Sequence, residues 1–81
     1  FPLLAFAFKA LERGGNIPCA LNAANEIAVA AFLGDKIGFS DIATIIDKAV
    51  ESTNFIKNIT FSDLVATNEE ARRIASSFIH N

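Results

Sequence analysis

Two amides and one carboxylate, Asn22, Asn25 and Glu26, are the polar residues whose spacing could support chemistry. Intervals of three and four residues place these side chains on one face of a helix. They could form a metal or substrate site, with Glu26 as a ligand or a base, but a divalent ion usually needs several oxygen ligands. No histidine or second acid lies at ligand spacing nearby. We therefore favour a structural role, in which the three side chains hydrogen-bond loop backbones or a neighbouring domain.

The single cysteine and the single histidine do not form a recognisable nucleophilic pair. Cys19 has no lysine or histidine close to it in the sequence, and a free cysteine usually packs as a small apolar residue. His80 lies next to the end of the sequence and is expected in solvent. A catalytic pair needs a nucleophile beside an oriented base, which one terminal histidine does not supply.

The composition predicts one small folded domain. Hydrophobic residues make up 52% of the 81 residues and charged residues 20%, a balance that excludes intrinsic disorder. The net charge of −2 and the scattered basic residues provide no basic face for nucleic acid. The apolar run 17–33 approaches the length of a membrane span, but the polar residues near its middle argue against lipid. The sequence lacks methionine and starts inside a helical pattern, so we expect a fragment of a longer chain.

Four apolar stripes of helical period indicate the elements that must position these side chains. Their members are Leu3, Leu4, Ala7, Phe8 and Leu11; Ile17, Ala20, Leu21, Ala24, Ile27, Ala28 and Ala31; Ile42, Ile45, Ile46, Ala49 and Val50; and Ala71, Ile74, Ala75, Phe78 and Ile79. The second helix is apolar nearly all round, which predicts a central position. Short connections favour antiparallel neighbours. The sequence therefore predicts an all-α fold, a small antiparallel four-helix bundle.

Capping residues predict where the helices begin. Asn16 is a favourable N-cap for the second helix, and Pro18 falls in its first turn. Ser40 is expected to cap the third helix. The T-N-E-E sequence from Thr67 to Glu70 is a capping-box pattern, which predicts that the main part of the last helix starts there. A separate helical turn is expected at residues 62–63.

Apolar residues outside the four stripes predict two further contacts. Phe55, Ile56 and Ile59 are expected to pin the loop before the last helix to the core. Phe1 and Phe6 are candidates for a surface that another part of a longer chain covers.

Several segments follow one another in the order seen in a known family. Residues 21–33 read LNAANEIAVAAFL, a run long enough to be specific. Residues 1–3 (FPL), 37–42 (IGFSDI) and 68–72 (NEEAR) are weaker on their own. Together they resemble the C-terminal helical domain of 1-deoxy-D-xylulose 5-phosphate reductoisomerase. The resemblance covers essentially the whole sequence.

That resemblance implies one part of an oxidoreductase. The family rearranges and reduces 1-deoxy-D-xylulose 5-phosphate to 2-C-methyl-D-erythritol 4-phosphate, in the non-mevalonate route to isoprenoids. It uses NADPH and a divalent cation, Mg²⁺ or Mn²⁺, bound in other domains. Residues 1–81 would then be the C-terminal helical bundle alone, without the NADPH-binding and catalytic domains. No catalytic, cofactor-binding or metal residue is carried over, and the fragment alone is expected to be inactive.

The resemblance also implies the partners of this chain. They are the catalytic domain of the same chain and, in the parent enzyme, a second subunit of a homodimer. The location would be the cytoplasm of a bacterium, or a plastid for a plant-type source. Asn22, Asn25 and Glu26 would fix the bundle against the linker or the catalytic domain. The alternative is a freestanding helical module that binds a partner helix or itself through its apolar faces.

Overall fold

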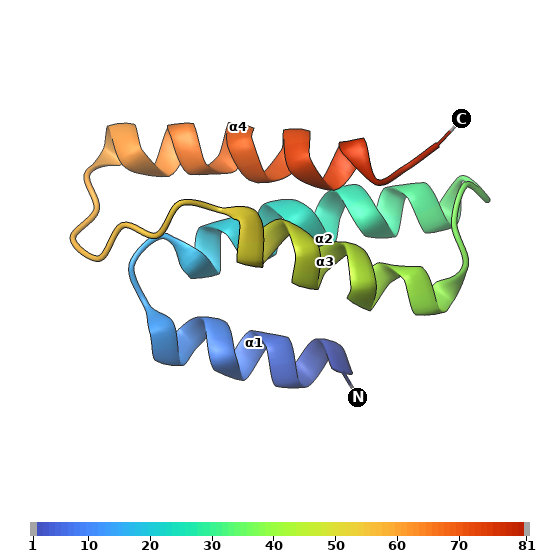
Figure 1. Cartoon of the computed structure of the whole chain (residues 1–81), viewed down its shortest axis with the longest axis horizontal. Coiled ribbons are helices and arrows are strands. Elements are labelled where there is room, and N and C mark those ends of the chain that lie inside the picture. The colour runs from blue at the N-terminus through green and yellow to red at the C-terminus, as the bar shows by residue number, and fades with distance from the viewer. Residues whose placement is uncertain (1, 81) are drawn as a thin grey trace.

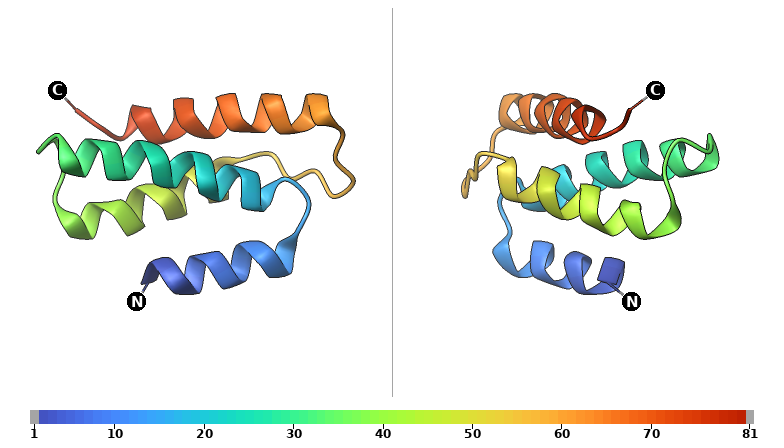
Figure 2. Two further views of the ribbon diagram at one scale, coloured as in Figure 1. Left: turned by 180° about the vertical axis from the view of Figure 1, so that it is seen from behind. Right: turned by 45° about the vertical axis from the view of Figure 1, so that its right-hand side comes forward.

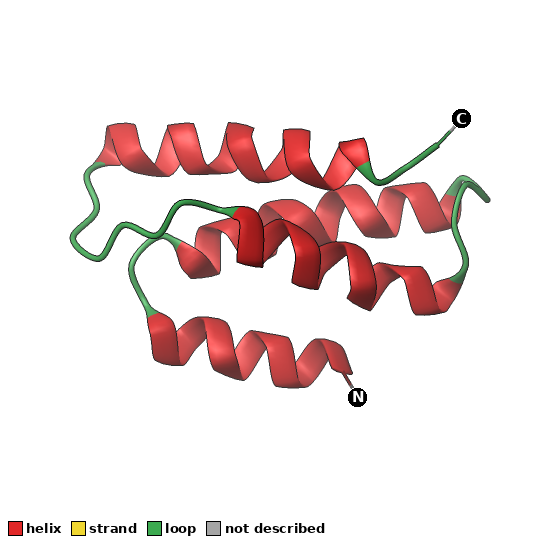
Figure 3. Cartoon of the chain, in the orientation of Figure 1, coloured by secondary structure: helices red, strands yellow, loops and turns green. Residues whose placement is uncertain are grey.

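A computed structural model describes residues 2–80, with every side chain in that range except those of residues 2, 3 and 6. The described residues form four α-helices: α1 (Pro2–Arg13), α2 (Ile17–Leu33), α3 (Phe39–Ser52) and α4 (Phe61–Ser77). Consecutive helices run in opposite directions (Figure 1), and the described part of the chain contains no strand (Figure 3). The predicted antiparallel bundle is confirmed.

Helix α2 lies at the centre of the bundle, as its all-round apolar sequence predicts. It packs against each of the other three helices, and α4 lies along it in the same direction (Figure 2). Its buried face consists of Ile17, Ala20, Ala23, Ala24, Ala28 and Ala31. The distance between packed helices depends on the side chains at their contact, so a face of alanines allows a close approach. Three large isoleucines of α3, Ile42, Ile45 and Ile46, fill the core beside it.

Helix α1 covers one side of the bundle, where it packs against α2 and α3 (Figure 1). The large side chains of its apolar stripe that the structure describes do not face the core. Leu4, Phe8 and Leu11 are 57, 61 and 69% exposed, whereas Ala10 on another face of the helix is buried. The periodicity marks an apolar face correctly, but the bundle itself does not cover that face.

The start of α3 differs slightly from the sequence-based prediction. The helix begins at Phe39 with Gly38 as the N-cap residue, so Ser40 lies inside the first turn. Asp41 closes this end, because its Oδ2 accepts a hydrogen bond from the Gly38 backbone N–H at 2.8 Å. The negative charge of an acidic side chain in the first turn also interacts favourably with the positive end of the helix dipole.

Helix α4 begins earlier than predicted, and it is continuous. Thr60 is its N-cap: Oγ1 accepts from the Asp63 backbone N–H at 3.1 Å, and the Thr60 N–H donates to Asp63 Oδ2 at 2.9 Å. This reciprocal pair is a capping box. Thr67, the predicted cap, is buried in the middle of the helix. Its hydroxyl accepts a hydrogen bond from Asn16 instead.

Candidate interaction surface

The three polar residues of α2 lie on the face of the helix that points away from the core. Asn22 and Glu26 are exposed, and Asn25 is half-buried. They do not converge on one point. Asn22 and Asn25 line a groove beside α1, whereas Glu26 reaches α4. This face of α2 therefore consists of two neighbouring features, a groove and an ion pair.

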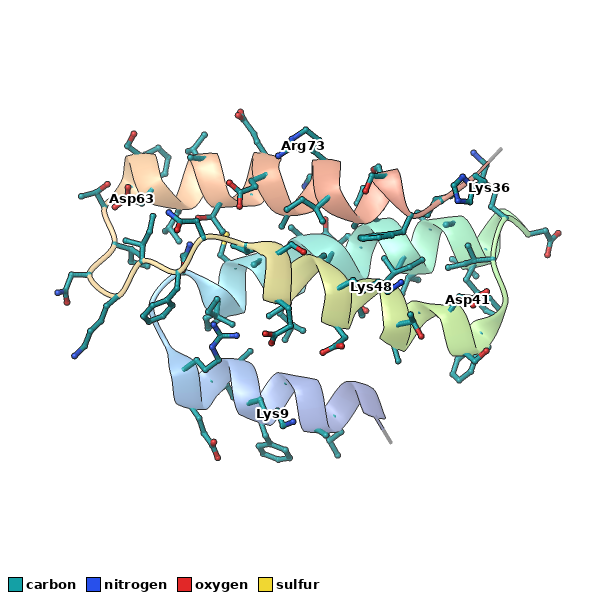
Figure 4. The ribbon with its side chains drawn as sticks, viewed as in Figure 1. Lys9, Lys36, Asp41, Lys48, Asp63 and Arg73 are labelled. Atoms are coloured by element: carbon teal, nitrogen blue, oxygen red, sulfur yellow. The ribbon has the colours of Figure 1, made fainter. Side chains whose placement is uncertain are left out.

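The ion pair joins Glu26 to Arg72 of α4, through Glu26 Oε2 and Arg72 Nη2. Arg72 Nε also donates a hydrogen bond to Asn68 Oδ1 at 3.0 Å, which fixes the guanidinium. Of the two arginines of α4, Arg73 points to solvent (Figure 4), whereas Arg72 is half-buried by these contacts. A partly exposed pair of this kind contributes at most about 1 kcal/mol to stability.

The groove lies between α1 and α2, with α3 at its base, and has a volume of about 380 Å³. It is lined by Leu4 and Ala7 of α1, by Pro18, Leu21, Asn22 and Asn25 of α2, and by Ile46 of α3. None of these lining residues is charged. Such a surface can hold an apolar group and hydrogen-bond to a neutral polar one, but it offers no acid or base.

Asn16 has a larger structural role than its predicted position as a helix cap implies. It occupies the N-cap position of α2 as predicted, but among the described residues its side chain makes no capping hydrogen bond. Asn16 is 1% exposed, and its Nδ2 donates to the Asn54 carbonyl at 2.7 Å and to Thr67 Oγ1 at 2.9 Å. Its Oδ1 accepts from the Ile56 backbone N–H at 2.8 Å. The amide thus ties the loop 53–60 to α2 and α4.

The backbone around Asn16 completes this attachment. The Asn16 N–H donates to the Ile56 carbonyl at 3.0 Å, so Asn16 binds both polar groups of that residue. Gly15 has φ +56°, and a Cβ there would lie 2.1 Å from the Ile56 oxygen. Only glycine permits this approach. Phe55, Ile56 and Ile59 were expected to pin the loop, but Phe55 and Ile59 are exposed and Ile56 is half-buried. The loop is attached by the hydrogen bonds between Asn16 and Ile56.

The remaining candidate residues have ordinary environments. Cys19 is partly buried, and its Sγ lies 3.6 Å from the Leu64 carbonyl oxygen, which agrees with a packing role. His80 is exposed, as expected. The described residues include no group of three or more His, Cys, Asp or Glu side chains that could hold a metal ion. Predictions for Phe1 and for the side chain of Phe6 lie outside the described residues.

A family model described as the DXP reductoisomerase C-terminal domain matches residues 1–74. The chain belongs to this family. The 1-deoxy-D-xylulose 5-phosphate reductoisomerase of Bacteroides thetaiotaomicron is 49% identical over 79 residues, which are 98% of this chain and 20% of that protein. The protein of the same name from Chlorobium phaeovibrioides is 46% identical, with 98% of this chain and 21% of that protein covered.

A solved structure shows the same fold as this DXP reductoisomerase C-terminal domain. The 1-deoxy-D-xylulose 5-phosphate reductoisomerase from Zymomonas mobilis in complex with NADPH superimposes with a TM-score of 0.89 and 44% identity. The match covers 96% of this chain and 21% of that one. The predicted resemblance is therefore confirmed, and the chain spans about a fifth of the length of the relatives it matches. Separately, none of the described helices is long and apolar enough to cross a membrane.

Proposed function

We propose that this chain is the supporting, non-catalytic C-terminal domain of a 1-deoxy-D-xylulose 5-phosphate reductoisomerase. The main support for the proposal is the match to the C-terminal domain family over residues 1–74. The relatives that this chain matches are about five times as long. The whole enzyme would be an NADPH-dependent oxidoreductase that makes 2-C-methyl-D-erythritol 4-phosphate for isoprenoid synthesis. We expect it to be a homodimer, in the bacterial cytoplasm or, for a plant-type source, in a plastid.

The residues of this chain do not fit the groups that the reaction requires. A divalent cation needs several oxygen ligands, and the described acids form no cluster of three. NADPH is held by a Gly-rich turn between a strand and a helix. The glycines here lie at helix ends: Gly14 and Gly15 follow α1, whereas Gly34 and Gly38 flank the turn between α2 and α3. We derive no step of the reaction through either group, and we assign both to the remainder of the enzyme.

The way the bundle uses its polar groups supports this role. Asn16 and Thr67 hold the bundle together internally, whereas Asn22 and Asn25 face outward beside the exposed stripe of α1. Exposed apolar residues in a continuous row favour contact with another protein surface. We propose that this outward face docks on the part of the same chain that precedes the bundle, the linker or the catalytic domain.

The test is to determine the coding sequence upstream of Phe1 and to express three proteins: the full product, the product without residues 1–81, and residues 1–81 alone. Reductoisomerase activity is measured as NADPH oxidation with 1-deoxy-D-xylulose 5-phosphate and Mg²⁺. We expect activity only in the full product. Activity of residues 1–81 alone would contradict the non-catalytic role. An upstream sequence without a dinucleotide-binding turn and an acidic cluster would favour the freestanding helical module. The exposed apolar residues of α1, Leu4, Phe8 and Leu11, are compatible with such a module.

A further inference from the structure

We propose that the groove between α1 and α2 binds an extended, apolar segment of the enzyme's own chain, the segment that directly precedes α1. Asn22 and Asn25 would hydrogen-bond to the backbone of that segment. This inference rests on the proposed function, because such a segment belongs to the longer enzyme. It goes further by naming which part of the enzyme the outward face of α2 binds, and how.

The lining of the groove matches a peptide better than a charged ligand. Leu4, Leu21 and Ile46 supply apolar walls, and the lining contains no charged residue. Its volume of about 380 Å³ lies near the lower end for sites that bind small ligands. An apolar wall with a few placed amides can take an uncharged side chain together with the peptide groups beside it.

The two amides have the chemistry and spacing that an extended backbone needs. Each Asn side chain carries one acceptor oxygen and one NH₂ donor, so it can pair with both polar groups of a peptide unit. Residues three apart on a helix have Cβ atoms about 5–6 Å apart. In an extended chain, every second residue faces the same way, with a repeat of roughly 6.5 Å. Among the described residues, neither Asn22 nor Asn25 has a side-chain hydrogen bond that would compete.

The position of the groove selects the segment before α1 as its occupant. Leu4 and Ala7, which form the α1 wall, belong to the first two turns of that helix. A chain that enters α1 at Pro2 therefore arrives beside the open groove. The 12 residues of α1 span about 18 Å along the helix axis. If the preceding chain turns back along the groove, about six extended residues cover that length. Because the matched family is a C-terminal domain, the rest of its relatives' sequence precedes this region.

Hydrogen exchange on the full-length enzyme tests the proposal. The Asn22→Ala/Asn25→Ala double variant removes the backbone partners, and Ala7→Phe fills the groove without removing a polar group. Asn58→Ala, at an exposed position in the loop before α4, is the matched control. We expect the segment before residue 1 to be protected in the wild type and in the control. In both groove variants its amides should exchange about tenfold faster, while the core amides of α3 stay unchanged.

Each outcome has one meaning. A preceding segment that exchanges freely in the wild type overturns the proposal, and so does protection that survives in both groove variants. Protection that depends on protein concentration would show that a second copy fills the groove, which also overturns it. Activity measured on the same samples separates the two proposals. An active enzyme with an unprotected segment rejects only the groove assignment, whereas an inactive full product with a protected segment rejects only the reductoisomerase function.

Discussion

Asn16 Nδ2 lies 2.9 Å from Thr67 Oγ1, and this hydrogen bond joins the start of α2 to the middle of α4. Both side chains are buried. A buried amide loses its contacts with water on folding, so each of its polar atoms needs a partner within the protein. Asn16 finds these partners in Thr67 and in the backbone of Asn54 and Ile56. One side chain thus sets the position of a loop and of two helices.

Replacing Asn16 tests how much of the stability depends on this arrangement. Asn16→Ala leaves the Ile56 N–H, the Asn54 carbonyl and the Thr67 hydroxyl without their partner. Because unsatisfied buried groups cost about 1–3 kcal/mol, we expect the free energy of unfolding to fall by roughly 2–3 kcal/mol. Urea denaturation followed by circular dichroism measures this. Asn58→Ala, at an exposed loop position, should change it by less than about 0.5 kcal/mol. Equal losses in the two variants would contradict the role of Asn16.

Thr67→Val removes only one of these contacts while keeping the shape of the side chain. Asn16 Nδ2 keeps its bond to the Asn54 carbonyl, so we expect a smaller loss of about 1 kcal/mol. The double variant with Asn16→Ala should lose less than the sum of the single losses, since both remove the same bond. A double-mutant cycle on unfolding free energies measures this coupling. Additive losses would show that the hydroxyl and the amide act independently.

The two glycines after α1 form a matched pair, because both have positive φ values but only one is crowded. An alanine at Gly14, with φ +67°, has nothing within 4 Å of its Cβ. At Gly15, with φ +56°, the Cβ would lie 2.1 Å from the Ile56 carbonyl oxygen. We expect Gly14→Ala to lower the unfolding free energy by about 1 kcal/mol through backbone strain alone. Gly15→Ala should lower it by at least 1 kcal/mol more, because the loop must also move.

Thermal and urea unfolding of both glycine variants provide the measurement. Equal losses of unfolding free energy would mean that the loop 53–60 can shift at Ile56 at little energetic cost. That result would contradict a tight attachment of the loop at Asn16.

The sequence predicts the helices well because their signals are local. The isoleucines of α3 recur at helical spacing, and they are buried as expected. The start of α4 is ambiguous for the same reason: the local pattern allows a capping box at Thr60 and another at Thr67. The structure uses Thr60, and the Thr67 hydroxyl accepts a hydrogen bond from Asn16 in the middle of the helix. That contact spans 51 residues, and no local pattern reports it.

The candidate surface could be predicted only in part. The spacing of Asn22, Asn25 and Glu26 correctly places them on one face of α2. It does not reveal that Arg72 of α4 pairs with Glu26, nor that the other two line a groove with α1. These are contacts between helices, and the angles at which helices pack are not encoded in the spacing of one helix. Their role in docking stays a prediction.

The exposed stripe of α1 predicts how the isolated chain behaves. Leu4, Phe8 and Leu11 form a row of large apolar side chains, and burying such a row against a second copy removes it from water. We expect residues 1–81 to self-associate in a concentration-dependent way in sedimentation equilibrium. Phe8→Glu places a charge in the centre of the row and should shift the chain to monomer. Phe61→Glu, at an exposed phenylalanine on α4 outside the stripe, is the control and should still associate.

The same experiment relates this surface to the parent enzyme. In the full-length product the stripe should be covered, so Phe8→Glu should weaken domain docking rather than dimer formation. We expect a lower melting temperature for this variant, with an unchanged subunit number. A wild-type chain of residues 1–81 that stays monomeric at every concentration would contradict self-association through α1. Equal dissociation of the Phe8→Glu and Phe61→Glu variants would place the contact elsewhere on the bundle.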